Sequence, residues 1–195
     1  MQRFTRLCFI VLVVAVLFTF GCAAKRICTV TIPCTTKLSN YDCLKIEQFT
    51  YSQAFREAKI KDADDEMKGN ILRDGLQQRV QYKIYNLNIF EDVVNAEPPD
   101  DAEQIVVLKG EITYMKRVTQ TARLMGGAYA GRARVDMDIH LVDFQTGDII
   151  GAASVKGTST GGPFGGLTEQ AFENTAQLIA EFIRNSYEQH SGASW

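Results

Sequence analysis

The sequence predicts an α+β fold in which an antiparallel sheet is covered on one face by two helices. Three segments of alternating apolar and polar residues predict a β-meander over residues 104–160, to which N-terminal strands are added. Two segments with apolar residues at three- and four-residue steps predict the helices. A sheet with one apolar face needs a cover, and both helices carry a matching stripe, so a two-layer domain follows.

The meander is the clearest part of this prediction. In residues 104–118 one face is expected to carry Val106, Leu108, Gly110, Ile112 and Tyr114. In residues 131–143 the apolar positions Ala133, Val135, Met137, Ile139 and Leu141 alternate with Arg132, Arg134, Asp136, Asp138 and His140. In residues 148–160 Ile149, Ala153 and Val155 alternate with Ser154, Lys156 and Thr158. Gly147 supplies the positive φ that a hairpin turn over residues 144–148 needs.

The helices are expected over residues 62–83 and 168–189. The first has the stripe Met67, Ile71, Leu72, Leu76, Val80 and Ile84, and the second has Ala171, Phe172, Thr175, Leu178, Ile179, Phe182 and Ile183. Residues 44–51 predict a strand with a bulge or an early end, because the apolar pattern changes phase between Ile46 and Phe49. A short strand over residues 86–92 and a surface loop over residues 96–102 complete the prediction.

The N-terminus carries a targeting signal. Arg3 and Arg6 precede an uncharged apolar run of 14 residues, 7–20, which is too short for a comfortable membrane span. Gly21 and Cys22 follow directly. The segment resembles a bacterial lipoprotein signal, although it has Thr19 where such signals usually have leucine. The resemblance implies that Cys22 is acylated and becomes the mature N-terminus.

Two alternatives stay open at this point, namely ordinary cleavage after Ala23 or Ala24, or an uncleaved anchor. The lipoprotein interpretation divides the chain into a signal peptide (1–21), a tether from Cys22 (22–42), one α+β domain (43–190) and a frayed tail (191–195). The lipid bilayer would then be a partner, reached through the acyl chains on Cys22.

Composition narrows the function classes. Loss of Arg3 and Arg6 with residues 1–21 lowers the basic side chains from 21 to 19 against 23 acidic ones, so the formal net charge becomes −4. A mildly acidic chain without a basic block argues against nucleic-acid binding.

Three cysteines besides Cys22 would stay in the mature chain: Cys28, Cys34 and Cys43. One disulfide could form among them in an oxidising envelope, with the pairing left open. Their spacing is not that of a zinc site, and His140 and His190 lie far away in sequence, so we expect neither metal nor cofactor.

Three segments could be mistaken for catalytic or ligand sites. The glycine-rich residues 126–131 lack the Lys-Ser/Thr pair of a phosphate loop and precede a strand, so we interpret them as a connection between strands. Residues 161–166 precede a helix without a nearby basic side chain, which favours a hinge over an anion site. His140 shares a polar strand face with Asp136 and Asp138, which charge pairing along a solvent face also explains. We therefore expect no catalytic residue.

Residues 123–183 resemble a family of bacterial lipoproteins known as domain of unknown function 4410. The resemblance rests on Arg123-Leu-Met-Gly-Gly-Ala-Tyr-Ala-Gly131, Leu141-Val142-Asp143, Thr146-Gly147-Asp148 and Ser159-Thr160-Gly161-Gly162 followed by Gly165-Gly166. It implies an α+β envelope lipoprotein and no particular reaction. By the rule for such lipoproteins, Ala23 rather than aspartate after Cys22 favours the outer membrane over the inner one.

The expectation from sequence is therefore a membrane-anchored, non-catalytic envelope lipoprotein. Its role would be that of an accessory or assembly protein that binds other envelope proteins through a sheet edge or the polar sheet face. The alternative is a periplasmic module that binds a small molecule or a lipid.

Overall fold

A computed structural model describes residues 25–100, 102–118, 131–160 and 168–190 of the chain. The elements in chain order are β1 (Arg26–Ile32), the 3-10 turn η1 (Leu38–Asn40), β2 (Cys43–Ile46), β3 (Thr50–Tyr51), α2 (Gln53–Lys59), α3 (Ala63–Tyr85), β4 (Asp92–Val94), β5 (Ile105–Lys116), β6 (Arg134–Asp143), β7 (Ile149–Thr158) and α5 (Thr168–His190).

The strands form one mixed sheet in the order β1-β7-β6-β5-β2-β4, with β3 beside the distal half of β5. The pairs β1–β7, β7–β6 and β6–β5 are antiparallel, which confirms the meander. The expectation of an antiparallel sheet throughout is wrong at the other edge, where β2 runs parallel to both β4 and β5 and β3 runs parallel to β5. Helix α3 lies between β2 and β4 in the chain and provides the long crossover that parallel strands need.

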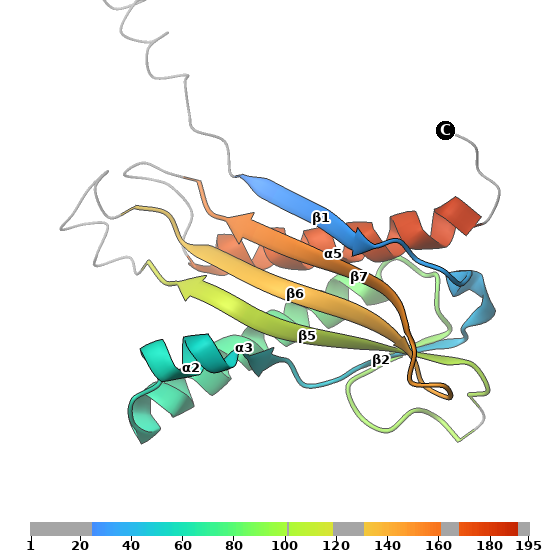
Figure 1. Cartoon of the computed structure of the whole chain (residues 1–195), viewed down its shortest axis with the longest axis horizontal. Helices are drawn as coiled ribbons and strands as arrows, with labels where there is room; N and C mark the ends of the chain where they lie inside the picture. The colour runs from blue at the N-terminus through green and yellow to red at the C-terminus, as the bar shows by residue number, and fades with distance from the viewer. Residues whose placement is uncertain (1–24, 101, 119–130, 161–167, 191–195) are drawn as a thin grey trace, which may run out of the picture.

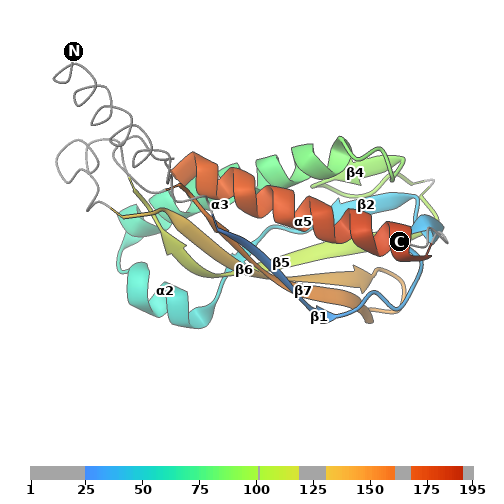
Figure 2. The same cartoon turned by 90° about the horizontal axis from the view of Figure 1, so that it is seen from above.

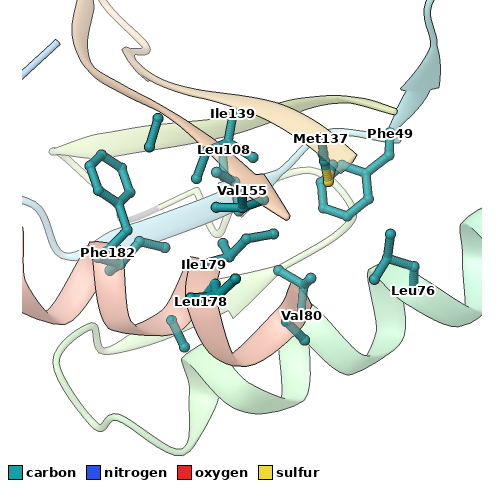
Figure 3. Packing of buried hydrophobic residues seen from close by; sticks show 14 of the residues in the cluster. Phe49, Leu76, Val80, Leu108, Met137, Ile139, Val155, Leu178, Ile179 and Phe182 are labelled. Atoms are coloured by element: carbon teal, nitrogen blue, oxygen red, sulfur yellow. The ribbon is translucent and has the colours of Figure 1, made fainter. Parts of the chain in front are cut away.

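Helices α3 and α5 lie side by side on one face of the sheet (Figures 1 and 2). Their apolar side chains meet those of the strands in one core, part of which Figure 3 shows. Every position of the expected α5 stripe is buried, and so are Val135, Met137, Ile139 and Leu141 of β6. The expected register of β6 is therefore confirmed.

The expected stripe of α3 is wrong in its first half. Leu76, Val80 and Ile84 are buried, but Met67 and Ile71 are 56% and 65% exposed. The buried side chains of α3 all lie in its second half, at Leu76, Gln77, Val80 and Ile84. Helix α2, which the sequence did not predict, packs near these first turns and against β5 (Figure 1).

The segment expected to be a tether belongs to the fold from Arg26 onward. Strand β1 pairs with β7, and Cys34, Leu38 and Tyr41 are buried in the core. Lys25 at its start donates a 2.8 Å backbone hydrogen bond to Thr158 Oγ1. The expected tether over residues 22–42 is therefore wrong over most of its length. Strand β1, which is rich in β-branched residues, completes the sheet as an edge strand.

Two smaller expectations have different outcomes. The strand expected over residues 44–51 does end early, since β2 stops at Ile46 and β3 covers only Thr50–Tyr51. The strand expected over residues 86–92 is displaced to β4, because the chain turns at Asn88, whose φ is 53°. The hairpin turn before β7 contains Gly147 at φ 76°, as expected.

Candidate functional site

A cleft of about 500 Å³ opens where β5 ends between helices α2 and α3. We call it the β5 cleft. Its lining residues are Tyr51, Phe55, Lys59, Ile60, Asp65, Lys68, Gly69, Leu72, Tyr114, Met115, Lys116 and Arg117. They come from α2, α3, β5 and the short strand β3. The apolar residues Tyr51, Phe55, Ile60, Leu72 and Met115 form the floor of the cleft, and the charged residues Lys59, Asp65, Lys68, Lys116 and Arg117 form its rim.

The floor is built around Tyr51, the last residue of β3. Its ring stacks on Phe55 with 5.1 Å between ring centroids and an interplanar angle of 16°. Its hydroxyl donates a 2.8 Å hydrogen bond to the carbonyl of Gly69 in α3. A Cβ on Gly69 would lie 3.4 Å from Tyr51 Cε2, at van der Waals contact, so α3 packs directly against the ring at this position. These contacts join β3, α2 and α3 around the floor of the cleft.

Local sequence explains why α2 stands beside the cleft. Ser52 follows Tyr51 directly, and its Oγ accepts a 3.2 Å hydrogen bond from the backbone N–H of Phe55. This is an N-cap, so the chain leaves the sheet at Ser52 and begins a helix. The capping pattern, with aromatic side chains four residues apart at Tyr51 and Phe55, is the signal by which α2 could have been found in the sequence.

A bulge in β5 shapes the opposite wall. The register with β6 shifts between Ile112 and Tyr114. The shift reverses the alternation, so Tyr114 is 40% exposed and Met115 is buried in the core. The expectation that Tyr114 shares the apolar face of Ile112 is therefore wrong. As a result, Met115 reaches the floor of the cleft, while Lys116 lies exposed at its mouth.

The rim of the cleft is mainly cationic. Lys59, Lys68, Lys116 and Arg117 line it, together with the single acid Asp65. Lys68 forms an ion pair with Asp64 one helical turn earlier. Burial raises the pKa of Tyr51 from its ordinary value, and the positive charges of Arg73 and Arg117 oppose that rise while Asp74 adds to it. The Tyr51 hydroxyl therefore stays protonated at neutral pH, although the charge of Arg117 favours its ionised form.

Among the described residues, one edge of β5 has no strand partner along the cleft. Strand β2 pairs with Ile105–Leu108, and β3 pairs with Glu111 and Ile112. The Ser52 N–H donates a further backbone hydrogen bond on this side, 3.0 Å, to the Ile112 carbonyl. Beyond it, β5 continues to Lys116 with β6 as its only neighbour among the described strands.

The polar sheet face holds the residues that the sequence singled out on β6. Asp136 accepts a 2.6 Å hydrogen bond from Arg134 Nε and lies 3.8 Å from Lys156 Nζ. Asp138 Oδ1 accepts a 2.5 Å hydrogen bond from the Ser154 hydroxyl. His140 stands opposite Lys109 and Ala152. Asp136 is thus paired with neighbouring cations, as charge pairing along a strand face predicts, whereas Asp138 is bound by a neutral hydroxyl.

The three cysteines are free thiols in the structure. Cys28 is exposed on β1, whereas Cys34 and Cys43 are buried. Burial is the largest cause that raises the pKa of each thiol. The expected disulfide among Cys28, Cys34 and Cys43 is therefore not formed here. Across the described ranges, no three His, Cys, Asp or Glu side chains come together as metal ligands.

Cys22, the residues 126–130 and the residues 161–166 lie outside the described residues. The helices that are described include none that is both long enough and apolar enough to span a bilayer.

A family model described as a domain of unknown function (DUF4410) matches residues 41–163. No curated protein matches the chain. Among solved structures, a dodecameric PelC from Paraburkholderia phytofirmans is 16% identical, with a TM-score of 0.49 over 81% of this chain and 97% of that one. The hypothetical protein CT253 from Chlamydia trachomatis is 8% identical, with a TM-score of 0.38 over 75% and 96%. The protein XCC0632 from Xanthomonas campestris is 12% identical, with a TM-score of 0.38 over 83% and 89%.

Proposed function

The chain belongs to the family DUF4410, a domain of unknown function, and from its own cleft we propose that it is a membrane-anchored, non-catalytic envelope protein that binds other envelope proteins. In this proposal Cys22 carries the lipid anchor, with the outer membrane as the destination, and the β5 cleft is the binding site. The observation that carries it is the free edge of β5 beside an apolar floor. A free strand edge offers backbone partners, and an apolar floor offers burial to side chains of a partner.

The chemistry of the cleft suits binding rather than catalysis. Its described lining contains no serine, cysteine or histidine, and the one buried hydroxyl, that of Tyr51, is held by the Gly69 carbonyl. The cations on the rim could orient a partner by charge. Apolar surface with a few placed polar groups is typical of recognition sites.

The position of the cleft fits a membrane anchor. Lys25, three residues after Cys22, hydrogen-bonds to Thr158 at the end of β7. Thr158 is opposite Arg134, which is opposite Lys116 at the end of β5. Lys25 and the β5 cleft therefore lie at the same end of the sheet, the end at which β1 begins and β5 ends in Figure 1. Three strand spacings of about 4.8 Å separate Lys25 from Lys116, or about 14 Å.

Capture from detergent-solubilised membranes tests the binding role. The paired change Lys116→Glu and Arg117→Glu should remove the proteins that wild type captures. The matched control is Lys37→Glu with Arg184→Glu, two exposed cations outside the cleft lining, which has the same change in charge. Equal loss in both variants, or in neither, would rule out the cleft as the binding site.

The anchor is tested separately. Cys22→Ser should move the protein from the membrane fraction to the soluble fraction, because the acyl chains hold it at the bilayer. Intact mass spectrometry of the wild-type protein should show the added lipid. A mature protein without acyl chains would contradict the anchor.

A second function is favoured by the size and polarity of the same cleft. Its volume of about 500 Å³ lies in the range of small-molecule sites, and cations above an apolar floor match an anionic amphiphile. Under this alternative, mass spectrometry of the purified protein should detect a bound lipid in stoichiometric amount. Leu72→Asp, which places a charge in the floor, should remove it.

A further inference from the structure

We propose that the β5 cleft binds an extended peptide segment with alternating apolar and acidic side chains, which adds to the free edge of β5 as a new strand. The inference rests on the proposed function and specifies the binding mode and the chemistry of the partner. Each part of it comes from a separate observation on β3, on the bulge of β5 and on the rim.

The added strand would lie along the edge of β5, beyond the point where β3 ends. Strand β3 contributes only Thr50 and Tyr51 before the N-cap at Ser52 directs the chain into α2. Strand β5 continues four residues beyond Ile112, to Lys116. Its outer backbone groups there have no strand partner in the described part of the chain. An unpaired strand edge is a template for a strand from another chain.

The two faces of β5 determine the side chains that the added strand would carry. Successive side chains of a strand point to opposite faces. On the inner face, beside buried Met115, the partner side chains would meet Phe55 and Leu72, so they should be apolar. On the outer face they would lie beside exposed Lys116, so they should be acidic.

The positive charge of the cleft excludes a basic peptide segment. Four cations and one carboxylate line the cleft, and Lys68 already has Asp64 as its partner. Lys59, Lys116 and Arg117 are exposed around the mouth, and no ion pair joins any of them to another described residue. A basic segment would meet charges of its own sign, whereas an acidic segment would be both attracted and positioned.

The test uses the full-length protein in detergent micelles and a capped octapeptide of alternating valine and glutamate. Amide hydrogen exchange is followed at residues 113–117. Bound peptide should slow exchange of the outward-pointing amides in this segment by at least about tenfold, because they gain backbone acceptors. A peptide with four valines followed by four glutamates has the same composition and serves as the control, with binding at least about tenfold weaker.

Two variants of the experiment separate strand addition from charge attraction. Methyl groups on every second peptide nitrogen remove the N–H donors along one edge of the peptide. Two such methylation patterns exist, one for each edge, and the pattern that blocks the edge facing β5 should weaken binding by at least about tenfold. Lys116→Glu with Arg117→Glu should weaken binding of the unmodified peptide about tenfold. Equal binding of both methylated sets, or binding without protection at residues 113–117, would overturn strand addition.

The failures of the two proposals are distinguishable. If membrane proteins are captured through the cleft but the alternating peptide leaves residues 113–117 unprotected, the binding role stands and strand addition is wrong. If the peptide protects β5 but charge reversal does not affect capture, the binding mode is open to this chain and the β5 cleft is not the site at which envelope proteins bind. Co-purification of a lipid that blocks the peptide would also overturn strand addition in the native protein.

Discussion

The hydroxyl of Tyr41 donates a 2.8 Å hydrogen bond to Asp143 Oδ2 at the end of β6, 102 residues later in the chain. The other oxygen of the same carboxylate accepts the backbone N–H groups of Gln145 and Thr146 at 3.0 and 2.8 Å. One side chain therefore fixes the β6–β7 turn and fastens the segment before β2 to it. This joins residues that the sequence assigned to a tether to the end of the central strand β6.

Asp143 should make stability depend on pH in the acid range. The backbone bond from Thr146, followed by the bond from Tyr41, lowers the pKa of Asp143 from its ordinary value. A lowered pKa in the folded state gives stability that is complete above the unfolded value of about 3.9 and is lost as the pH falls through the folded value. Asp143→Asn should lower the Tm at pH 7, and the difference from wild type should shrink toward pH 3.

Thermal unfolding between pH 7 and pH 3 measures this effect. Tyr41→Phe is the control, because it removes one hydrogen-bond donor to the carboxylate and leaves the two turn bonds in place. Its Tm difference should shrink less than that of Asp143→Asn. A gap between wild type and Asp143→Asn that stays constant over the whole range would contradict the role of the carboxylate.

Two substitutions at neighbouring positions test the register of β6. Ile139 is fully buried among the strands and helices, so Ile139→Asp would bury a charge without a partner. We expect a loss of several kcal/mol in the free energy of unfolding, enough to threaten a domain of ordinary stability, roughly 5–15 kcal/mol. His140→Gln on the opposite face should change it by less than about 0.5 kcal/mol. Denaturant unfolding checks both, and a tolerated Ile139→Asp would mean that the register is wrong.

The sequence predicted those parts of the fold in which one period runs over many residues. Strands β5, β6 and β7 and helix α5 have long alternating or helical patterns, and their inward faces are as expected apart from the end of β5 and the two ends of β7, where Ile149 is 48% exposed and Thr158 is buried. The failures have local causes. At Tyr114 one extra residue reverses the alternation, which no pattern of polarity reveals. At Met67 and Ile71 a good apolar stripe extends past the layer that it was expected to cover.

The cleft could not be predicted from sequence because it depends on how three elements end. Helix α2 has no buried residue, so it has no strong apolar stripe to reveal it. The rim cations lie in separate parts of the chain, at Lys59, Lys68 and Lys116–Arg117. They come together only because β3 is short and α2 turns back toward α3. The parallel pairing of β2 with β5 was missed for a similar reason, since strand direction follows from the crossover through α3.

The thiols should react in the order of their exposure. Cys28 is exposed, whereas Cys34 and Cys43 are buried. Burial raises the pKa of all three, so little thiolate is present at pH 7 and modification should be slow. Alkylation without reductant, followed by mass analysis, should label Cys28 first, and the other two only after denaturant is added. If two thiols resist alkylation until a reductant is added, a disulfide is present and the thiols are not all free.

The central claim is that partner proteins lie in the β5 cleft, and site-specific photo-crosslinking in cells tests it most directly. A photoreactive amino acid replaces Phe55 in the cleft in one variant, and Tyr82, which is 65% exposed on α3 and does not line the cleft, in the other. We predict discrete protein adducts from position 55 that disappear when Lys116→Glu and Arg117→Glu are added, and none of these adducts from position 82. The same adducts from both positions, or lipid adducts alone from position 55, would contradict the claim.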